Sequence, residues 1–179
     1  MITTIINVIT LSRILCAFLI YLILYLENNY SIALFLFLIA SFSDFFDGYL
    51  ARKTNSVSVL GEILDPIADK LLIVFVLIGL SVNLDSFLIG FISSVIISRE
   101  IWVAALRDIN SRNNQSDKTR VTFLAKIKTA IQMLSILMYL LGLTIDNMMV
   151  LFFADIILII ALLVTIQTGF QYTISTFKK

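Results

Sequence analysis

Four aspartates stand in two pairs near the ends of apolar stretches. Asp44 and Asp47 are three residues apart in the chain, and Asp65 and Asp69 are four residues apart. In a helix, each of these spacings puts both side chains on one face. A connection of about ten residues lets the two helices pack antiparallel. The sequence therefore predicts that the four carboxylates meet in one pocket.

Carboxylates in an apolar bundle need cations, because an unpaired charge there is costly. The chain contains no histidine, and a set of carboxylate oxygens suits Mg²⁺, Mn²⁺ or Ca²⁺ rather than zinc. We therefore predict a divalent-metal site held by Asp44, Asp47, Asp65 and Asp69. Two alternatives remain open at this point. The acids could form a structural ion network with Arg52, Lys53 and Lys70, or they could line an ion-transport path.

The composition indicates an integral membrane protein. Of 179 residues, 60% are apolar and 14% are charged, and the mean hydropathy is +1.02. A chain of this size cannot bury that much apolar surface within itself. A soluble enzyme, a nucleic-acid-binding module and a disordered chain are excluded, and no nucleic-acid partner is expected. The single cysteine, Cys16, excludes a disulfide framework.

Apolar runs of about 20 residues predict six transmembrane helices in one all-α domain spanning residues 1–179. The predicted spans are Ile5–Leu26, Tyr30–Leu50, Gly61–Asn83, Phe87–Leu106, Phe123–Leu143 and Met148–Gln167. Three of the connecting loops contain no Lys or Arg, whereas basic residues occur in the other two loops, at the C-terminus and at the N-terminal end of the first span. The positive-inside rule therefore places both termini in the cytoplasm. Residues 107–120 are predicted to form a solvated loop.

A longer pattern surrounds the four aspartates. It reads Asp44-x-x-Asp47-Gly48-x-x-Ala51-Arg52, then eight residues, then Gly61-x-x-x-Asp65-x-x-x-Asp69. This pattern resembles the signature of the CDP-alcohol phosphotransferase family of membrane enzymes. The resemblance implies a six-helix bundle that forms a homodimer. It also implies transfer of a phosphatidyl group from a CDP-linked lipid to an alcohol, with release of CMP.

The remaining residues of this pattern fit a nucleotide. Gly48 and Ala51 lack bulk, so a nucleotide can approach the helix, although small residues also serve helix packing in membranes. Arg52 can bind phosphate as a planar fork, or it can act as an anchor on the cytoplasmic side. Gly61 allows a similar close approach, or it simply begins the third span.

Three further motifs resemble the bacterial phosphatidylglycerophosphate synthases within that family. They are Asn7-x-x-Thr10-x-x-Arg13, Arg99-Glu100-Ile101 and Lys126-x-Lys128-Thr129-x-x-Gln132. The resemblance covers about residues 5–135, and the last span adds only hydrophobicity to it. It implies CDP-diacylglycerol and sn-glycerol 3-phosphate as substrates, with Asn7 and Thr10 among the contacts of the CDP-lipid. A bacterial inner membrane location follows, with the active site at the cytoplasmic face.

Cations near the cytoplasmic ends of several spans suit an acceptor that carries a phosphate. We predict that Arg13, Arg99, Lys126 and Lys128 hold this phosphate. Arg99 is not expected to pair with its neighbour Glu100, because adjacent residues do not share a helix face. An ion pair between Arg99 and another helix remains open, as does a role of the two lysines in contacting lipid headgroups.

The predicted mechanism is an in-line substitution at phosphorus. Two Mg²⁺ or Mn²⁺ ions would clamp the pyrophosphate, and Asp69 would act as the general base on the primary hydroxyl of the acceptor. Two other functions remain open. The acceptor could be phosphatidylglycerol, serine or an inositol phosphate, or the protein could be a cation transporter.

Overall fold

The computed structural model describes residues 2–54, 59–119 and 122–178. Side chains are described for residues 7–43, 61, 64–115, 117–119 and 122–178. The described chain consists of helices and short connections and contains no strand. The elements are α1 (Ile2–Leu26), α2 (Tyr30–Thr54), α3 (Val59–Asn83), α4 (Phe87–Arg112), the short 3₁₀ helix η1 (Ser116–Thr119), α5 (Phe123–Thr144) and α6 (Met148–Phe177). The prediction of an all-helical protein is confirmed.

Short polar connections end one helix and begin the next. Asp85 and Asp146 adopt the left-handed conformation, with φ of 47° and 52°, which Asp and Asn tolerate better than most residues. The following amides close the helix ends: Ser86 N–H donates to Ser81 O, and Asn147 N–H donates to Gly142 O. The side chains of Ser86 and Asn147 then accept hydrogen bonds from the first turns of α4 and α6. Each of these three-residue connections, residues 84–86 and 145–147, therefore reverses the chain.

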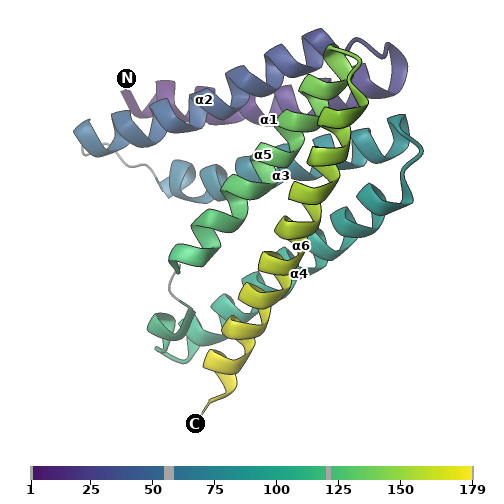
Figure 1. Ribbon diagram of the computed structural model, residues 1–179. Helices are drawn as coiled ribbons and strands as arrows, with labels where there is room; N and C mark the ends of the chain where they lie inside the picture. The colour runs from purple at the N-terminus through teal and green to yellow at the C-terminus, as the bar shows by residue number, and fades with distance from the viewer. Residues whose placement is uncertain (1, 55–58, 120–121, 179) are drawn as a thin grey trace.

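The helices meet at one end of the molecule and spread apart at the other (Figure 1). The α1–α2, α3–α4 and α5–α6 connections lie together in the upper right of the view. The helix α1 packs on α2 and α3, and α6 packs on α4 and α5. The central helices α3 and α5 contact each other and join these two groups. At the spreading end, α3, α4 and α5 face a common space near the helix ends that are predicted to lie on the cytoplasmic side.

Apolar and polar side chains divide the bundle along its length. The main apolar core lies toward the three short connections and includes Ile20, Leu24, Leu77, Leu80 and Ile89, all almost fully buried. Toward the spreading end, a small apolar cluster of Val103, Leu106 and Tyr172 remains, and many other buried positions are polar or charged. They include Thr10, Arg13, Arg99, Lys128, Gln132, Thr165 and Thr168. The apolar half holds the helices together by packing, and the polar half contains the side chains that can form a site.

The outer surface suits a bilayer. By length and composition, the described residues contain four candidate membrane spans. They are Asn7–Leu26, Phe87–Arg112, Asp117–Thr144 and Met148–Phe177, and a shorter apolar stretch covers Tyr30–Ser43. Large apolar side chains on these helices are exposed, among them Phe35, Phe91 and Phe170. The protein is therefore a multi-pass membrane protein, whereas six spans and the side of each terminus remain predictions.

The predicted solvated loop at 107–120 is wrong in its first part. The helix α4 continues to Arg112, and residues 116–119 form η1. Asn110 is 1% exposed, and its Nδ2 donates to Thr176 Oγ1 of α6 at 2.9 Å. This partner satisfies the side-chain N–H of Asn110 inside the bundle, so a polar composition does not exclude a helix whose other residues, such as Asp108 and Arg112, are exposed.

Candidate active site

Helices α1 and α3 run side by side in parallel, and side chains of α1 bind two of the predicted metal ligands on α3. Thr10 Oγ1 donates to Asp65 Oδ1 at 2.7 Å, and Arg13 Nη1 donates to Asp69 Oδ1 at 2.8 Å. Thr10 and Arg13 are one turn apart on α1, and Asp65 and Asp69 are one turn apart on α3, so the same two helix faces make both contacts. Arg13 is 1% exposed, whereas Asp69 is 30% exposed. Asp69 is thus held from one side and accessible from the other.

Part of the predicted site lies outside the described residues. The side chains of Asp44, Asp47, Gly48, Ala51 and Arg52 belong to this part. Within the described chain, no group of three or more Asp, Glu, Cys or His side chains gathers as a metal site. The described contribution consists of Asp65 and Asp69, one turn apart on α3, a donor type that fits Mg²⁺ or Mn²⁺. The four-aspartate metal site stays a prediction.

The two remaining residues predicted to contact the CDP-lipid lie near these carboxylates in the chain. Gly61 is buried in the first turn of α3, one turn before Asp65. Asn7 is half-buried on α1, one turn before Thr10. Thr10 itself is fully buried and bonded to Asp65. Their contacts with a nucleotide stay predictions.

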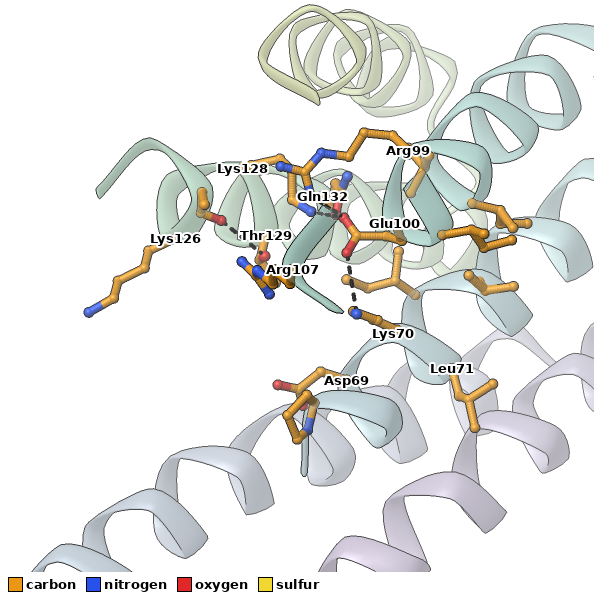
Figure 2. A pocket seen from close by; sticks show the side chains of 17 residues that line it. Asp69, Lys70, Leu71, Arg99, Glu100, Arg107, Lys126, Lys128, Thr129 and Gln132 are labelled. Atoms are coloured by element: carbon orange, nitrogen blue, oxygen red, sulfur yellow. Dashed lines mark hydrogen bonds and ion pairs between the residues drawn. The ribbon is translucent and has the colours of Figure 1, made fainter. Parts of the chain in front are cut away.

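A cavity of about 550 Å³ opens beside Asp69, between α3, α4 and α5 (Figure 2). Its described lining contains two carboxylates and five cations. The carboxylates are Asp69 and Glu100, and the cations are Lys70, Arg99, Arg107, Lys126 and Lys128. The cavity therefore brings Arg99, Lys126 and Lys128 together with Asp69, as predicted for a phosphate-bearing acceptor. Arg13 instead pairs with Asp69, and its role in phosphate binding stays a prediction.

The cations do not contribute equally to the cavity. Lys128 is 5% exposed, and Arg99 is 8% exposed. Lys126 is exposed, and Figure 2 shows its ammonium group extending away from the others. Lys128 and Arg99 thus form the floor of the cavity, and Lys126 belongs to its rim.

Glu100 is the centre of the charged floor. Its Oε1 accepts hydrogen bonds from Lys128 Nζ and from Arg99 Nη1, the latter at 2.8 Å. Its Oε2 lies 3.6 Å from Lys70 Nζ. The prediction that Arg99 does not pair with its neighbour is therefore wrong. The side chains of Arg99 and Glu100 are long enough to meet beyond the helix surface, where Lys128 of α5 also contacts the Glu100 carboxylate. Their Cα atoms lie on different faces of α4, but this does not keep the charged groups apart.

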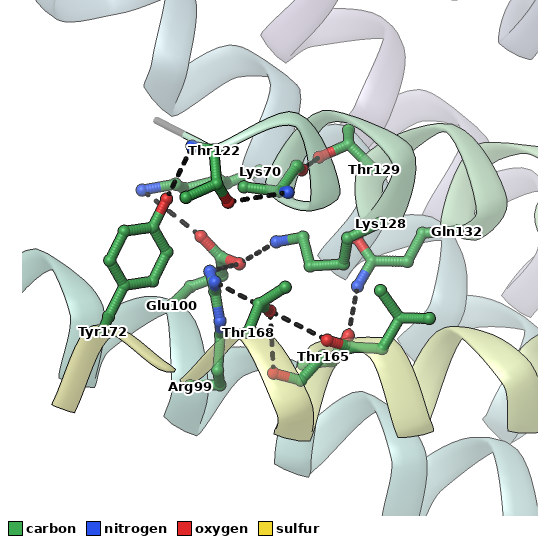
Figure 3. Close-up of polar contacts among 12 residues, drawn as sticks. Lys70, Arg99, Glu100, Thr122, Lys128, Thr129, Gln132, Thr165, Thr168 and Tyr172 are labelled. Carbon is green, nitrogen blue, oxygen red and sulfur yellow. Dashed lines mark hydrogen bonds and ion pairs between the residues drawn. The ribbon is translucent and has the colours of Figure 1, made fainter. Parts of the chain in front are cut away.

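The last helix supplies the wall behind Arg99 (Figure 3). Arg99 Nη2 donates to Thr168 Oγ1 at 3.0 Å, and the guanidinium lies 5.6 Å from the centre of the Tyr172 ring. Gly169 leaves room for Arg99, because a Cβ there would stand 3.1 Å from Arg99 Cγ. Gln132 Nε2 donates to Thr165 Oγ1 at 3.1 Å.

Sequence reasoning assigned none of these α6 residues to the site. A signal was available in the sequence. Thr168, Gly169 and Tyr172 follow Thr165 by three, four and seven residues, and these spacings place all four on one face of a helix. They form a small and polar stripe on an otherwise apolar span. Glu100 was also missed as a site residue, although an intramembrane carboxylate is a functional candidate by the same rule that selected the aspartates.

Two guanidiniums in the cavity wall have buried donors without a partner. The Nε atoms of Arg99 and Arg107 find no hydrogen-bond acceptor among the described residues. Arg107 also lies over the Tyr172 ring, 5.6 Å from its centre. Buried donors of this kind are normally satisfied, so their presence beside a cationic cavity favours an anionic ligand.

Comparison with known proteins identifies the family of the chain. The sequence model of the CDP-alcohol phosphatidyltransferase family matches residues 3–167. This chain belongs to that family. It is consequently an enzyme of the transferase class.

Several relatives of this CDP-alcohol phosphatidyltransferase carry one name, CDP-diacylglycerol–glycerol-3-phosphate 3-phosphatidyltransferase. The relative from Rickettsia felis is 39% identical over 93% of this chain and 91% of its own length. The relative from Rickettsia typhi is 38% identical over 93% of both chains. The relative from Escherichia coli K12 is 30% identical over 73% of this chain and 72% of its own length. The matches to the two Rickettsia proteins span nearly the whole chain, so they include both Asp69 and the cationic cavity.

Proposed function

We propose that this family member transfers the phosphatidyl group of CDP-diacylglycerol to sn-glycerol 3-phosphate, giving phosphatidylglycerophosphate and CMP. The observation that carries the proposal is the cavity beside Asp69, with five cations in its described lining. A phosphate ester would place its charge among these cations and its hydroxyl toward Asp69. The shared name of the relatives supports the same acceptor.

In this reaction Asp69 acts as the general base. It accepts the proton of the acceptor's primary hydroxyl, whose oxygen bonds to the lipid-side phosphorus while the bond from that phosphorus to the CMP oxygen breaks. Arg13 holds one oxygen of Asp69 and so fixes the orientation of the carboxylate. Arg99 and Lys128 hold the acceptor phosphate at the cavity floor, and Arg107 and Lys126 complete its wall and rim.

A divalent metal belongs to this proposal. Asp44, Asp47, Asp65 and Asp69 would bind Mg²⁺ or Mn²⁺, and two such ions would supply charge stabilisation for the pyrophosphate and the leaving CMP. Thr10 orients Asp65 through its hydroxyl. Gly48, Ala51, Arg52, Gly61 and Asn7 would contact the nucleotide part of the lipid.

The proposal also includes the membrane arrangement. Six spans place both termini and the active site at the cytoplasmic face of a bacterial inner membrane, where glycerol 3-phosphate is dissolved. The acyl chains of CDP-diacylglycerol stay in the bilayer beside the exposed apolar helix faces. The working form is a homodimer, as the family resemblance implies.

The experiment is a CMP-release assay on purified protein in detergent micelles containing CDP-diacylglycerol. With glycerol 3-phosphate and Mg²⁺, we expect stoichiometric CMP and phosphatidylglycerophosphate. Removing the metal with a chelator should abolish the reaction, and added Mg²⁺ or Mn²⁺ should restore it. Full activity after chelation would overturn metal dependence. Absence of CMP release, together with Mg²⁺ flux into sealed proteoliposomes that contain the same protein, would favour a transporter.

A further inference from the structure

The charged floor of the acceptor cavity contains an anionic side chain, Glu100, among its cations. Glu100 is 17% exposed and stands between cations of three helices: Lys70 of α3, Arg99 of α4 and Lys128 of α5. Figure 3 shows its carboxylate facing the donor groups of Arg99 and Lys128. The carboxylate thus occupies the donors that the proposed function assigns to the acceptor's phosphate.

A carboxylate and a phosphate compete for the same donors. Both accept charge-assisted hydrogen bonds from a guanidinium and an ammonium group. The two negative charges also repel each other within a partly buried site, where the interaction is stronger than in water. A phosphate that enters the cavity must therefore share Lys128 and Arg99 with Glu100 or displace it from them.

Arg99 has other contacts that remain when Glu100 is displaced. Arg99 keeps the hydrogen bond of its Nη2 to Thr168 Oγ1 and its position over Tyr172. Lys70 is 41% exposed, so Glu100 can remain beside it at the solvent side. The exchange of one anion for another consequently requires a movement of the Glu100 side chain and no change of fold.

We propose that Glu100 acts as an internal counter-anion of the acceptor cavity and weakens the binding of phosphate groups there. The proposal rests on the proposed function, in which the acceptor and the lipid product carry the same phosphate. A floor of cations without a counter-charge would retain the product and would also bind inorganic phosphate. Glu100 keeps both interactions reversible.

The test compares phosphate binding by the wild type and the Glu100→Gln variant, using full-length protein in detergent and isothermal titration calorimetry with inorganic phosphate. Gln keeps the size of the side chain and removes its charge. We expect the variant to bind inorganic phosphate about ten- to a hundred-fold more tightly, the range that one charge-assisted hydrogen bond supports. In turnover, KM for glycerol 3-phosphate should fall while KM for CDP-diacylglycerol stays unchanged.

Asp108→Asn is the matched control. Asp108 lies about two turns from Glu100 on the same helix, is 58% exposed, and pairs with Arg112 at 2.8 Å outside the cavity. Its loss removes the same charge and should leave phosphate affinity unchanged. If Glu100→Gln does not fold, Glu100→Asp replaces it, because a side chain shorter by one methylene group reaches Lys128 less well and should also bind phosphate more tightly.

Equal or weaker phosphate affinity in the folded variant overturns the inference, because Glu100 would then order the cations rather than compete for them. An equal gain in Asp108→Asn overturns it as well, since the effect would be one of net charge alone. Failure of the proposed function has a different signature. It would appear as wild-type protein that releases CMP with serine or phosphatidylglycerol and not with glycerol 3-phosphate.

Discussion

Asp69 stands where the carboxylate pair of α3 meets the cationic cavity. Arg13 holds its Oδ1 at 2.8 Å from the α1 side, and the cavity lies on the other side. No other described carboxylate combines a fixed orientation on α3 with access to the cavity. This placement supports the role of a base that meets an acceptor hydroxyl.

The substitution Asp69→Asn tests this role. We expect kcat to fall at least about 100-fold, because general acid–base catalysis contributes about 10²–10⁴ and the amide cannot accept the proton. Binding of CDP-diacylglycerol, measured on the same purified protein, should persist. The control Asp108→Asn should retain turnover. A variant that keeps more than about a tenth of the wild-type kcat would remove Asp69 from this role.

The cations of the cavity floor are tested by Arg99→Ala and Lys128→Ala. Each loses one charge-assisted contact to the acceptor's phosphate, so KM for glycerol 3-phosphate should rise about ten- to a hundred-fold. KM for CDP-diacylglycerol should not change. Arg112→Ala, which removes an exposed cation of α4 outside the cavity, is the control. If both KM values stay constant while the membrane-inserted yield drops, the two residues are topological anchors.

Residue types and spacing predicted three of the five cations that line the cavity beside Asp69. They missed Lys70 and Arg107, and they did not predict the ion pairs. Lys126 and Lys128 differ by two residues in the same motif, and only the packing of α5 against α6 and the contact of Lys128 with Glu100 show that Lys128 is buried and Lys126 exposed. The ion pair between Arg99 and Glu100 was not predicted, because a rule about Cα positions ignores the reach of long side chains. Pairings between helices depend on tertiary contacts that one sequence does not specify.

At the scale of elements, α6 is the wall that keeps Arg99 in place. Thr168 accepts one hydrogen bond from the guanidinium, Tyr172 lies beneath it, and Gly169 admits its aliphatic stem. The backbone amide of Thr122 donates to the Tyr172 hydroxyl at 3.1 Å, which ties the start of α5 to the same wall. Three helices thus set the position of one guanidinium.

Gly169→Ala should therefore raise KM for glycerol 3-phosphate several-fold, because a Cβ at 3.1 Å displaces the Arg99 stem by a few tenths of an ångström. The control is Gly79→Ala. Its Cβ would also stand 3.1 Å from a side-chain atom, Leu24 Cδ1, but in the apolar core far along the bundle from the cavity. An equal rise of KM in both variants would indicate a general loss of packing rather than displacement of Arg99.

The contribution of α6 was predictable only in part. Its length and apolar character predicted a span from residues 148 to 167, and the helix continues to Phe177. The stripe of Thr165, Thr168 and Gly169 is visible in the sequence, but small and threonine residues also serve ordinary helix packing in membranes. Only the contact with Arg99 distinguishes the two uses.

At the scale of the whole molecule, the apolar half of the bundle lies toward the short connections and the polar half toward the spreading end (Figure 1). Long apolar runs and the polar clusters between them predicted the helices and their order, because both are local features. The spreading of the helices is a property of packing and was not predicted. It creates the space in which Asp69 and the cations meet.

Cysteine labelling tests the proposed orientation of this bundle. In a Cys16→Ser background, single cysteines replace Glu27, Phe87 or Met148 at the short connections, or Arg112 at the opposite end. A membrane-impermeant thiol reagent added to intact cells should label the first three positions. It should label Arg112→Cys only after the cells are opened. Labelling of Arg112→Cys in intact cells would place the active site on the wrong face for a dissolved cytoplasmic acceptor.

The most direct measurement of the central claim compares two acceptors that differ by one phosphate. Purified wild-type protein is given CDP-diacylglycerol and Mg²⁺ with either glycerol 3-phosphate or glycerol, and kcat/KM is determined from CMP release. The cations at the cavity floor should favour glycerol 3-phosphate by at least about ten- to a hundred-fold, the value of a single charge-assisted contact. Serine and phosphatidylglycerol should be poor acceptors. Equal kcat/KM for glycerol and glycerol 3-phosphate would contradict the account, because the cavity beside Asp69 would then not recognise a phosphate.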